Sequence, residues 1–501
     1  MNSHTDALAP RPIVSLSLLL AGSLLVGFSM GRWLAPLAAW IGPALILRYS
    51  RDHKGWLGYP LVLVAYIPAF LIGFGENWAS QFPLPIVSIL AVFYAFLWSL
   101  PYLADRLMGA RLKGFSSTLV FPLAATTLEL VNTQINPVGT WGATGFTQYG
   151  NLPLMQLASV TGMIGITFLM GWFASVANLA WENRSRGGEI LRGLATFGVV
   201  LAVVFLFGFL RLNFAPSSET VRVAGITTES GRPFGRRVMK MTDPAAIRLA
   251  LQSHWDAYFR ETVREAQAGA RVIVWPEGAG FTFSSEEASL IARAQEVARQ
   301  NGIYLAIGMY TVPDGPDTGQ LDKNWLLLID PSGATVMEHI KFGGAIIERR
   351  LIGDGKLQTV ATPFGVLSGV ICYDLDYPAV IQQTGQKGAG LLLVPSYDWP
   401  AIDPVHSHMA AFPAIENGMS IVRQTSDGLS IAVDPYGRVL GQVDYFGSTD
   451  RTMVAQVPVR HVATIYTAFG RWLGWGFVVA FLLVVGYVLA RAMMAREAAG
   501  I

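Results

Sequence analysis

The sequence contains little cysteine and little charge, and both shortages limit what the protein can be. Its 501 residues include one cysteine, so no disulfide can form within the chain. Only 14% of the residues are charged and 52% are hydrophobic, which is too apolar for an ordinary soluble enzyme of this length. The formal net charge of +2 leaves no excess to attract nucleic acid. The composition therefore favours a protein embedded in a membrane.

Long apolar runs are concentrated in the first part of the chain. A transmembrane helix needs about 20 mainly apolar residues. Suitable windows lie at 13–30, 33–48, 58–75, 84–103, 116–133, 153–181, 193–212 and 472–490. We therefore predict a membrane domain over residues 1–214 with seven transmembrane helices, a polar domain over 219–463 and an eighth transmembrane helix at 470–495. The first run leads directly into a second one, so we interpret it as an uncleaved anchor and not a signal peptide.

Lysine and arginine residues near the ends of these runs predict the orientation in the membrane. They gather around residues 11, 48–54, 106–113, 184–192 and 491–496. The short connections between these groups hold only Arg32. The positive-inside rule places the basic connections in the cytoplasm. Both termini are therefore predicted to be cytoplasmic, and seven crossings bring the polar domain to the outer face, which in a bacterium is the periplasmic side of the inner membrane.

Two features of the membrane domain allow more than one interpretation. The loop 133–152 is uncharged and rich in Gly, Asn, Gln and Thr. It is either a re-entrant or surface loop, or a lid or groove that faces the outer domain. Glu129 lies inside a predicted span, where an ionisable side chain is expected to be paired or functional. The sequence does not identify its partner.

The polar domain alternates strand-like runs with helical stretches. The strand-like runs are 221–226, 271–277, 303–310, 324–330, 334–340, 365–374, 390–396, 419–425, 430–434 and 438–443, and the helical stretches are 244–268, 285–301 and 406–417. This alternation predicts a layered α/β or α+β domain. Two turns with Asp first, Pro second and Gly fourth begin at Asp330 and Asp434, and they predict antiparallel hairpins.

Three polar residues stand at the predicted ends of strands, where sites are commonly built: Glu277, Lys341 and Cys372. A thiolate is a strong nucleophile, but the thiol needs a neighbouring base or cation to ionise at neutral pH. Glu277 can accept the thiol proton, and Lys341 with the backbone N–H of Tyr373 can stabilise an oxyanion. The set suffices for acyl transfer through a thioester. The alternative is that Cys372 is a small buried hydrophobe and that the other two are ordinary strand-end residues.

Further polar residues near these strand ends allow other interpretations. Tyr397, Asp398 and Trp399 follow a strand end and either line a pocket or pack in its wall. His406 and His408 have no cysteine or carboxylate set at metal-binding spacing, so no metal site is expected.

Four ordered motifs resemble the nitrilase, or carbon-nitrogen hydrolase, superfamily. They are Trp275-Pro276-Glu277, Lys341, Gly369-Val370-Ile371-Cys372-Tyr373-Asp374 and Ala414-Ile415-Glu416-Asn417-Gly418. Seven spans, an outer nitrilase-like domain and one last span resemble the apolipoprotein N-acyltransferase family, as does the stretch from 144 to 158. The resemblance covers nearly the whole chain. It implies a four-layer αββα sandwich on a polytopic helical membrane domain, with neither cofactor nor metal.

The resemblance also implies a two-step reaction. Cys372 takes an acyl chain from a phospholipid and releases a lysophospholipid. The thioester then acylates the free α-amine of the diacylglyceryl-cysteine at the N-terminus of a lipoprotein. A membrane-tethered amidase or nitrilase, in which water resolves the intermediate, would use the same triad. A lipid donor is favoured because eight spans are an excessive anchor for a soluble substrate, and the retained triad argues against a non-catalytic scaffold or transporter.

One run and two single residues depart from the pattern of that family. Lys341 is followed by Phe342-Gly343-Gly344-Ala345-Ile346-Ile347-Glu348 in place of a His-Leu-Val-Pro-Phe-Gly-Glu-like run. Asp374 replaces the usual Glu, and Pro413 replaces an Arg that often precedes Ala-Ile-Glu-Asn. The triad is unaffected, but the identity of the acceptor is left open. The residues expected to contact substrate or the oxyanion are Tyr373, Glu348, Asp374, Tyr397 and Trp399, with Glu348 as a candidate for the carboxylate of that loop.

Overall fold

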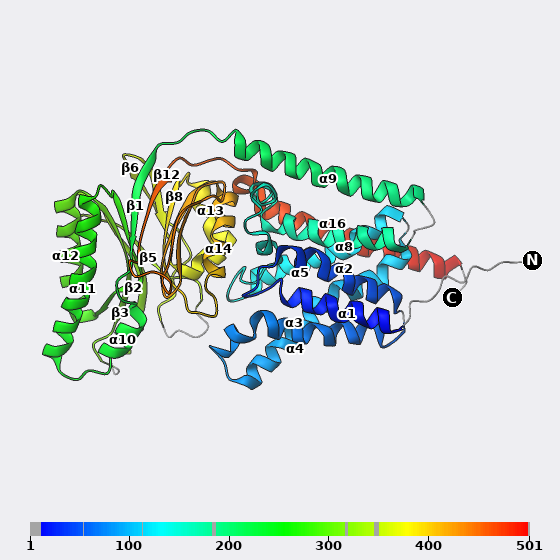
Figure 1. Ribbon diagram of the computed structural model, residues 1–501, viewed down its shortest axis with the longest axis horizontal. Helices are drawn as coiled ribbons and strands as arrows, with labels where there is room; N and C mark the ends of the chain where they lie inside the picture. The colour runs from blue at the N-terminus through cyan, green and yellow to red at the C-terminus, as the bar shows by residue number, and fades with distance from the viewer. Residues whose placement is uncertain are drawn as a thin grey trace, which may run out of the picture.

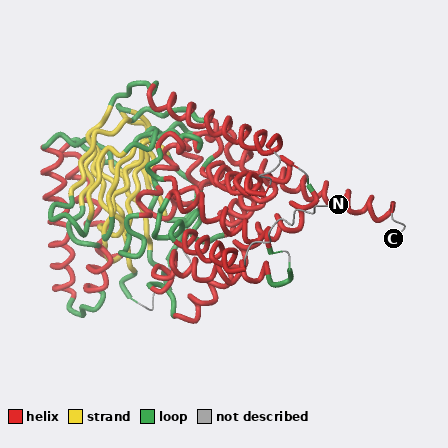
Figure 2. Tube along the Cα trace, turned by 45° about the vertical axis from the view of Figure 1, so that its right-hand side comes forward, coloured by secondary structure: helices red, strands yellow, loops and turns green. Residues whose placement is uncertain are grey.

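The computed structural model describes residues 12–53, 55–112, 114–182, 187–315, 319–344 and 350–498. A helical part and a sandwich of strands and helices lie end to end along the longest axis of the molecule (Figure 1). The strands are gathered in the sandwich, while the other end consists of helices (Figure 2). Glu348 lies outside the described residues.

The helical part is built mainly from apolar helices that pack side by side. They are α1 (Pro12–Gly27), α2 (Pro36–Asp52), α3 (Gly58–Ala79), α4 (Leu84–Met108), α5 (Val120–Ile135), α8 (Met163–Glu182), α9 (Gly187–Asn213) and α16 (Ile465–Ala498). Among the described residues, six helical segments are long and apolar enough to cross a membrane. Helices α1 and α2, with 16 and 17 residues, are shorter than these. Length and composition thus support six of the eight predicted spans.

The predicted span at 153–181 is wrong as a single helix. Two short helices, α6 (Leu152–Met155) and α7 (Ala158–Thr161), precede α8. Gly162 ends α7 with a φ of +69°, a conformation that glycine adopts at little cost. The long helix therefore begins at Met163. The preceding turns contact the sandwich, where Gln156 Nε2 donates to the backbone carbonyl of Tyr436 at 2.9 Å.

Two six-stranded sheets form the centre of the sandwich. The outer sheet, farther from the helical part, has the order β12-β1-β2-β3-β4-β5, and the inner sheet has the order β11-β10-β9-β8-β7-β6 (Figure 1). The outer strands are β1 (Thr220–Ile226), β2 (Val272–Phe283), β3 (Tyr304–Val312), β4 (Lys323–Ile329), β5 (Thr335–Ile340) and β12 (Thr452–Pro458). The inner strands are β6 (Thr359–Thr362), β7 (Gly365–Gly369), β8 (Leu391–Tyr397), β9 (Ser420–Ser426), β10 (Leu429–Val433) and β11 (Val439–Asp444).

The two sheets repeat one arrangement. Strands β1, β2 and β3 are parallel in one sheet, and β7, β8 and β9 are parallel in the other. Both predicted hairpins are confirmed, because β4 pairs antiparallel with β5 and β10 with β11. Each turn is closed by its aspartate. Asp330 Oδ1 accepts the backbone N–H of Ser332 at 2.9 Å, and Asp434 Oδ1 accepts that of Tyr436 at 2.8 Å.

Helices cover both outer faces of the paired sheets and complete the predicted αββα order. Helices α10 (Gly231–Val238), α11 (Pro244–Gln267) and α12 (Ser284–Asn301) cover the outer sheet, and α13 (Pro378–Gln386), α14 (Val405–Met409) and α15 (Ala411–Asn417) cover the inner sheet (Figure 1). Apolar side chains of both sheets, such as Val274 and Leu393, fill the space between them. The inner helices share one apolar core with the helical part, where the rings of Phe412 and Phe146 lie 4.9 Å apart.

Candidate functional site

Glu277 lies inside β2 and not at its end, so the predicted strand boundary is wrong. The ladder between β2 and β3 stops after Trp275 and resumes at Gly280, which leaves Glu277 in an irregular segment. Gly278 has a φ of +75°, and a side chain at Gly308 would collide with this segment. An interruption of this kind re-aims a side chain without ending the strand.

Glu277 and Lys341 form a buried ion pair. Lys341 Nζ donates to Glu277 Oε1 at 2.7 Å, and Asn324 Nδ2 donates to the same oxygen at 2.7 Å. The Glu277 and Lys341 residues are 3% and 2% exposed. Within the described part of the chain, Glu277 Oε2 has no hydrogen-bond partner. Buried polar atoms are normally paired, so this oxygen is available to accept a proton.

Lys341 is placed by the strand that precedes it. β5 ends at Ile340, yet the backbone N–H of Lys341 still donates to the carbonyl of Asn324 on β4 at 2.9 Å. The backbone carbonyl of Lys341 accepts the N–H of Gly353 at 3.0 Å. Both the N–H and the carbonyl of Lys341 are therefore hydrogen-bonded to the protein. This fixes the backbone so that the side chain reaches Glu277.

Cys372 begins a 3₁₀ turn, Cys372–Asp376, that follows β7. Its φ is +46°, which is uncommon for a residue with a side chain and is maintained only by the surrounding structure. The residue is 1% exposed. Its thiol donates to the backbone carbonyl of Tyr397 at 3.5 Å, and Nη2 of Arg423 lies 3.9 Å from Sγ.

Asp374 joins the cysteine turn to the segment after Lys341. Its Oδ1 accepts two backbone N–H groups from residues 342 and 343, at 2.8 and 2.6 Å. Its Oδ2 accepts the N–H of Ile371 at 3.0 Å and lies 2.8 Å from Nε2 of His339. Both oxygens are thus occupied by the protein, so Asp374 connects the two segments and presents no free oxygen to a substrate.

A buried cluster of charged side chains lies beside the sulfur. Arg423 donates to both oxygens of Asp398 at 2.7 and 2.8 Å. His406 lies between Asp398, 3.0 Å from Nδ1, and Asp376, 2.8 Å from Nε2. Burial acts to lower the pKa of His406, but the Asp376 carboxylate outweighs it and raises this pKa well above its ordinary value. Burial acts to raise the pKa of Asp398, and the Arg423 guanidinium instead holds it well below its usual range.

Possible metal-ligand atoms do meet in this cluster. Atoms of Cys372, Asp398 and His406 lie within 4.8 Å of one another. The guanidinium of Arg423 already neutralises Asp398, and an added metal cation would face both this group and a protonated histidine. The charge balance therefore disfavours a metal ion at this position.

Two predicted residues, Tyr397 and Trp399, lie at and just after the end of β8. The carbonyl of Tyr397 accepts the thiol, and the guanidinium of Arg232 lies 4.4 Å from the centre of its ring. Nε1 of Trp399 donates to Oγ of Ser80 at 3.1 Å, at the connection between α3 and α4. Trp399 thus contacts the helical part, while Tyr397 lies next to the sulfur.

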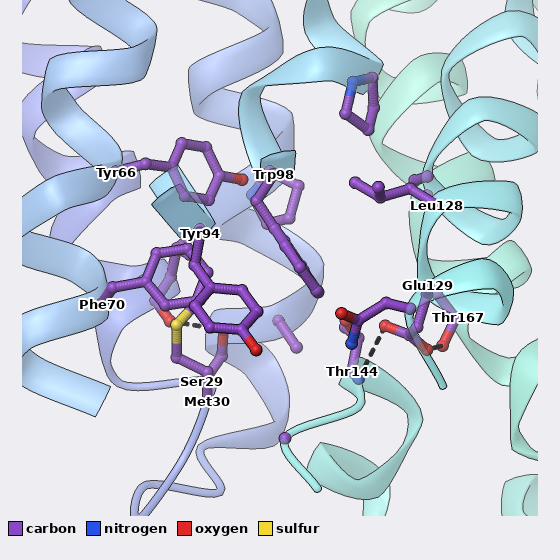
Figure 3. Close-up of a pocket in the computed structure, with 18 of the residues that line it drawn as sticks. Ser29, Met30, Tyr66, Phe70, Tyr94, Trp98, Leu128, Glu129, Thr144 and Thr167 are labelled. Carbon is purple, nitrogen blue, oxygen red and sulfur yellow. Dashed lines mark hydrogen bonds between the residues drawn. The ribbon is translucent and has the colours of Figure 1, made fainter. Parts of the chain in front are cut away.

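An aromatic cavity of about 110 Å³ lies in the helical part. Tyr66, Phe70, Tyr94 and Trp98 of α3 and α4 line one side, and Leu128, Glu129, Thr144 and Thr167 line the other (Figure 3). The structure identifies the partners of Glu129. Its carboxylate accepts the backbone N–H of Thr144 at 2.9 Å and the hydroxyl of Thr167 at 2.6 Å. The carboxyl group is therefore turned toward the loop 133–152.

Trp141, on that loop, belongs to both the cavity and the candidate site. It lines the cavity, and its ring lies 5.3 Å from that of His406 and 6.5 Å from that of Tyr373. The backbone N–H of Thr140 donates to the carbonyl of Asp376 in the cysteine turn at 2.9 Å. Of the two interpretations of this loop, the structure therefore supports the one in which it faces the sandwich.

Sequence reasoning missed two residues of this arrangement. Asn324 is the second residue of the apolar strand β4 and is fully buried. Arg423 lies inside the fully buried strand β9. Charged residues are almost never fully buried unless they are paired, so an arginine in a β-rich run was a usable signal of a buried partner.

Comparisons with known proteins also divide the chain into a helical part and a sandwich. Residues 15–176 match the model of the apolipoprotein N-acyltransferase N-terminal domain, and residues 243–466 match the carbon-nitrogen hydrolase model. Among solved structures, an amidase from Nesterenkonia sp. is 20% identical with a TM-score of 0.40, and the alignment covers 51% of this chain and 95% of that one.

Relatives named apolipoprotein N-acyltransferase align with both parts. The Geobacter metallireducens protein is 24% identical over 81% of this chain and 80% of its own length. The Brucella melitensis protein is 27% identical over 85% and 78%, and the Rhodopseudomonas palustris protein is 25% identical over 92% and 88%. The two family models together, and the relatives that span most of the chain, indicate the same family. The chain therefore belongs to the apolipoprotein N-acyltransferase family.

Proposed function

We propose that this protein transfers a fatty acyl chain from a phospholipid, through a thioester on Cys372, to the N-terminal amine of a diacylglyceryl-cysteine lipoprotein. The observation that carries the proposal is the position of Trp141, which lines the aromatic cavity of the membrane helices and also contacts Tyr373, the residue after Cys372. A nucleophile connected to an apolar cavity through Tyr373 and Trp141 suits a lipid donor. The names of the relatives support the same activity.

In the first half of the reaction, the free oxygen Oε2 of Glu277 accepts the proton of the thiol. Sγ of Cys372 then attacks the ester carbonyl of the phospholipid. The ammonium of Lys341 and the backbone N–H of Tyr373 stabilise the oxyanion. When the ester bond breaks, the lysophospholipid oxygen takes the proton from Glu277, and the acyl chain remains on sulfur.

In the second half, the amine of the acceptor attacks the thioester carbonyl. Glu277 accepts one amine proton, the carbon–sulfur bond breaks, and the thiolate of Cys372 is reprotonated by Glu277. The products are an amide and the starting enzyme. These proton transfers and attacks require no cofactor.

A membrane-tethered carbon-nitrogen hydrolase is the second candidate, because water can replace the amine with the same triad. The two functions differ in the fate of the thioester. An acyltransferase moves the chain to an added diacylglyceryl-cysteine peptide, whereas a hydrolase releases a free fatty acid at the same rate with or without that peptide.

The test follows the acyl group by intact mass. Protein purified in detergent is incubated with phospholipid, and we expect an acyl-sized adduct that hydroxylamine removes. Cys372→Ala serves as the control and should carry no adduct. Adding the diacylglyceryl-cysteine peptide should then discharge the enzyme and acylate the peptide. Transfer by the Cys372→Ala variant, or release of fatty acid alone, would contradict the proposal.

We also propose the membrane arrangement on which this reaction depends. Residues 1–214 carry seven spans, residues 219–463 form the catalytic domain on the periplasmic face of the inner membrane, and residues 470–495 form the eighth span. Reporter fusions near residues 188 and 320 test this proposal. The first should report the cytoplasm and the second the periplasm, and the opposite result would exclude the lipoprotein acceptor.

A further inference from the structure

Arg423 brings a positive charge to the sulfur from within the inner sheet. Its Nη2 lies 3.9 Å from Cys372 Sγ, and its side chain is fully buried. Charges attract more strongly where water is excluded, so a buried cation at this distance has a large effect on a thiolate. Lys341, another cation of the site, donates to Glu277 at 2.7 Å.

We propose that Arg423 is a further catalytic residue, the counter-ion of the Cys372 thiolate. It stabilises the negative sulfur after the thiol proton has moved to Glu277, and again when the thioester breaks. The role of Arg423 in the acyl-transfer cycle rests on the proposed function, whereas its pairing with the thiolate does not.

Several hydrogen bonds hold the guanidinium in place. Besides both oxygens of Asp398, Arg423 Nη1 donates to the hydroxyl of Thr425 at 2.8 Å and to that of Ser407. A bidentate pair with a carboxylate fixes both the position and the plane of the guanidinium. Rotation of the group away from the sulfur would break these contacts together.

His406 is a positioning residue that contacts Asp398 and also Arg423, whose Nη2 lies 2.9 Å from Nδ1 of His406. Asp398 alone would cancel the charge of Arg423. The Asp376 carboxylate raises the pKa of His406 well above its ordinary value, and in its protonated form His406, held between Asp398 and Asp376, adds a second cation that balances the second carboxylate. Removing the imidazole would leave excess negative charge beside the sulfur and disfavour the thiolate.

The other charged groups around the cysteine come from neighbouring elements. Glu277 of β2 and Lys341 after β5 approach from the outer sheet as an ion pair. Asp374 of the cysteine turn is paired with His339 of β5. Each carboxylate opposes a negative sulfur, so the charge balance depends on the cations, and Nη2 of Arg423 lies 3.9 Å from Sγ.

The single cysteine makes this pairing measurable without any substrate. The rate of alkylation by iodoacetamide is measured on the full-length protein in detergent across a range of pH. Arg423→Met removes the positive charge and should lower the alkylation rate at neutral pH about tenfold or more. It should also move the midpoint of the pH profile upward by about one pH unit or more. Arg423→Lys keeps the charge but loses the bidentate pair with Asp398, so its midpoint should lie between those of wild type and Arg423→Met. Arg222→Met, which removes a partner of Glu265 in the outer sheet, is the matched control and should change neither quantity.

Folding is followed in parallel by thermal unfolding. If Arg423→Met does not fold, the test uses His406→Gln. This variant keeps Arg423 and is expected to move the midpoint of the alkylation profile upward by a smaller amount. An unchanged midpoint in folded Arg423→Met, or in His406→Gln when Arg423→Met cannot fold, would overturn the inference. Shifted midpoints in a protein that transfers no lipid acyl group would instead count against the proposed function alone.

Discussion

The two helix layers of the sandwich differ in length and in what covers them. In the outer layer, α11 and α12 have 24 and 18 residues and expose side chains such as Leu249, which is 68% exposed. In the inner layer, α13, α14 and α15 have nine, five and seven residues, and every residue of α15 is buried. The outer layer forms an exposed surface of the domain. The inner layer is buried between the inner sheet and the membrane helices, with which it shares one apolar core.

The same division runs through the candidate site. The outer sheet supplies Glu277, Asn324 and Lys341, and the inner sheet supplies Cys372 and Arg423. The proposed proton acceptor and the proposed nucleophile therefore come from opposite sheets, and Cys372 belongs to the sheet nearer the helical part. Substitutions in each layer separately test whether the inner layer contributes mainly to stability and the outer sheet mainly to chemistry.

The largest effect is expected from the inner layer. Phe412 is fully buried and meets Phe146 of the helical part. Phe412→Ala should lower the free energy of unfolding by about 3–5 kcal/mol, because it removes a large side chain and leaves a cavity. Leu249→Ala on the exposed face of α11 should change it by less than about 0.5 kcal/mol. Denaturant unfolding in detergent measures both, and equal losses would contradict the contrast between the layers.

In the outer sheet the expected effect is on chemistry. Glu277→Gln cannot accept the thiol proton, and Lys341→Met keeps the length of the side chain without its charge. Each should slow formation of the Cys372 thioester about 100-fold to 1,000-fold with phospholipid alone. Glu338→Gln, on the exposed side of β5, is the control and should acylate normally. A stable thioester in Glu277→Gln would show that Glu277 acts only in the second half-reaction.

A smaller, pH-dependent effect is expected at Glu416 of α15. Burial raises its pKa from 4.5 to about 7, although the backbone N–H of Met163, 2.9 Å from Oε1, acts to lower it. The folded state then binds more protons than the unfolded state between these two values. Stability should therefore fall as pH rises through this window and stay level above it.

Glu416→Gln should remove this dependence. The amide keeps the acceptor for Met163 and has no charge to bury, so the variant should be more stable than wild type above neutral pH by roughly 1–3 kcal/mol. Thermal unfolding at a series of pH values measures the difference. A wild-type slope in the variant would assign the pH dependence to another group.

The smallest effect is expected at the edge of the interface. Trp399→Phe removes the hydrogen bond from the indole to Ser80 together with part of the ring, and it should cost about 0.5–1.5 kcal/mol. Trp56→Phe, at a tryptophan that is 83% exposed, should be neutral. A loss as large as that of Phe412→Ala would mean that Trp399 supports more of the interface than this one hydrogen bond.

Local patterns in the sequence were enough for most elements of the fold. Apolar length predicted the long membrane helices, alternation of strand-like and helical runs predicted the layers, and the aspartate turns predicted two hairpins. The break at Gly162 was missed because the apolar composition continues through it, while its positive φ depends on packing against neighbours such as Tyr466.

The sequence by itself determined which residues carry reactive chemistry, because a lone cysteine, a glutamate and a lysine beside apolar strands have those properties in any fold. Only the tertiary structure decided how they are used. The bulge in β2 aims Glu277 at Lys341, and sheet pairing brings Asn324 to the same carboxylate. Arg423 reaches Cys372 from a strand 51 residues further along the chain. Such contacts depend on strand order and burial, which join residues distant in the chain and leave no local pattern.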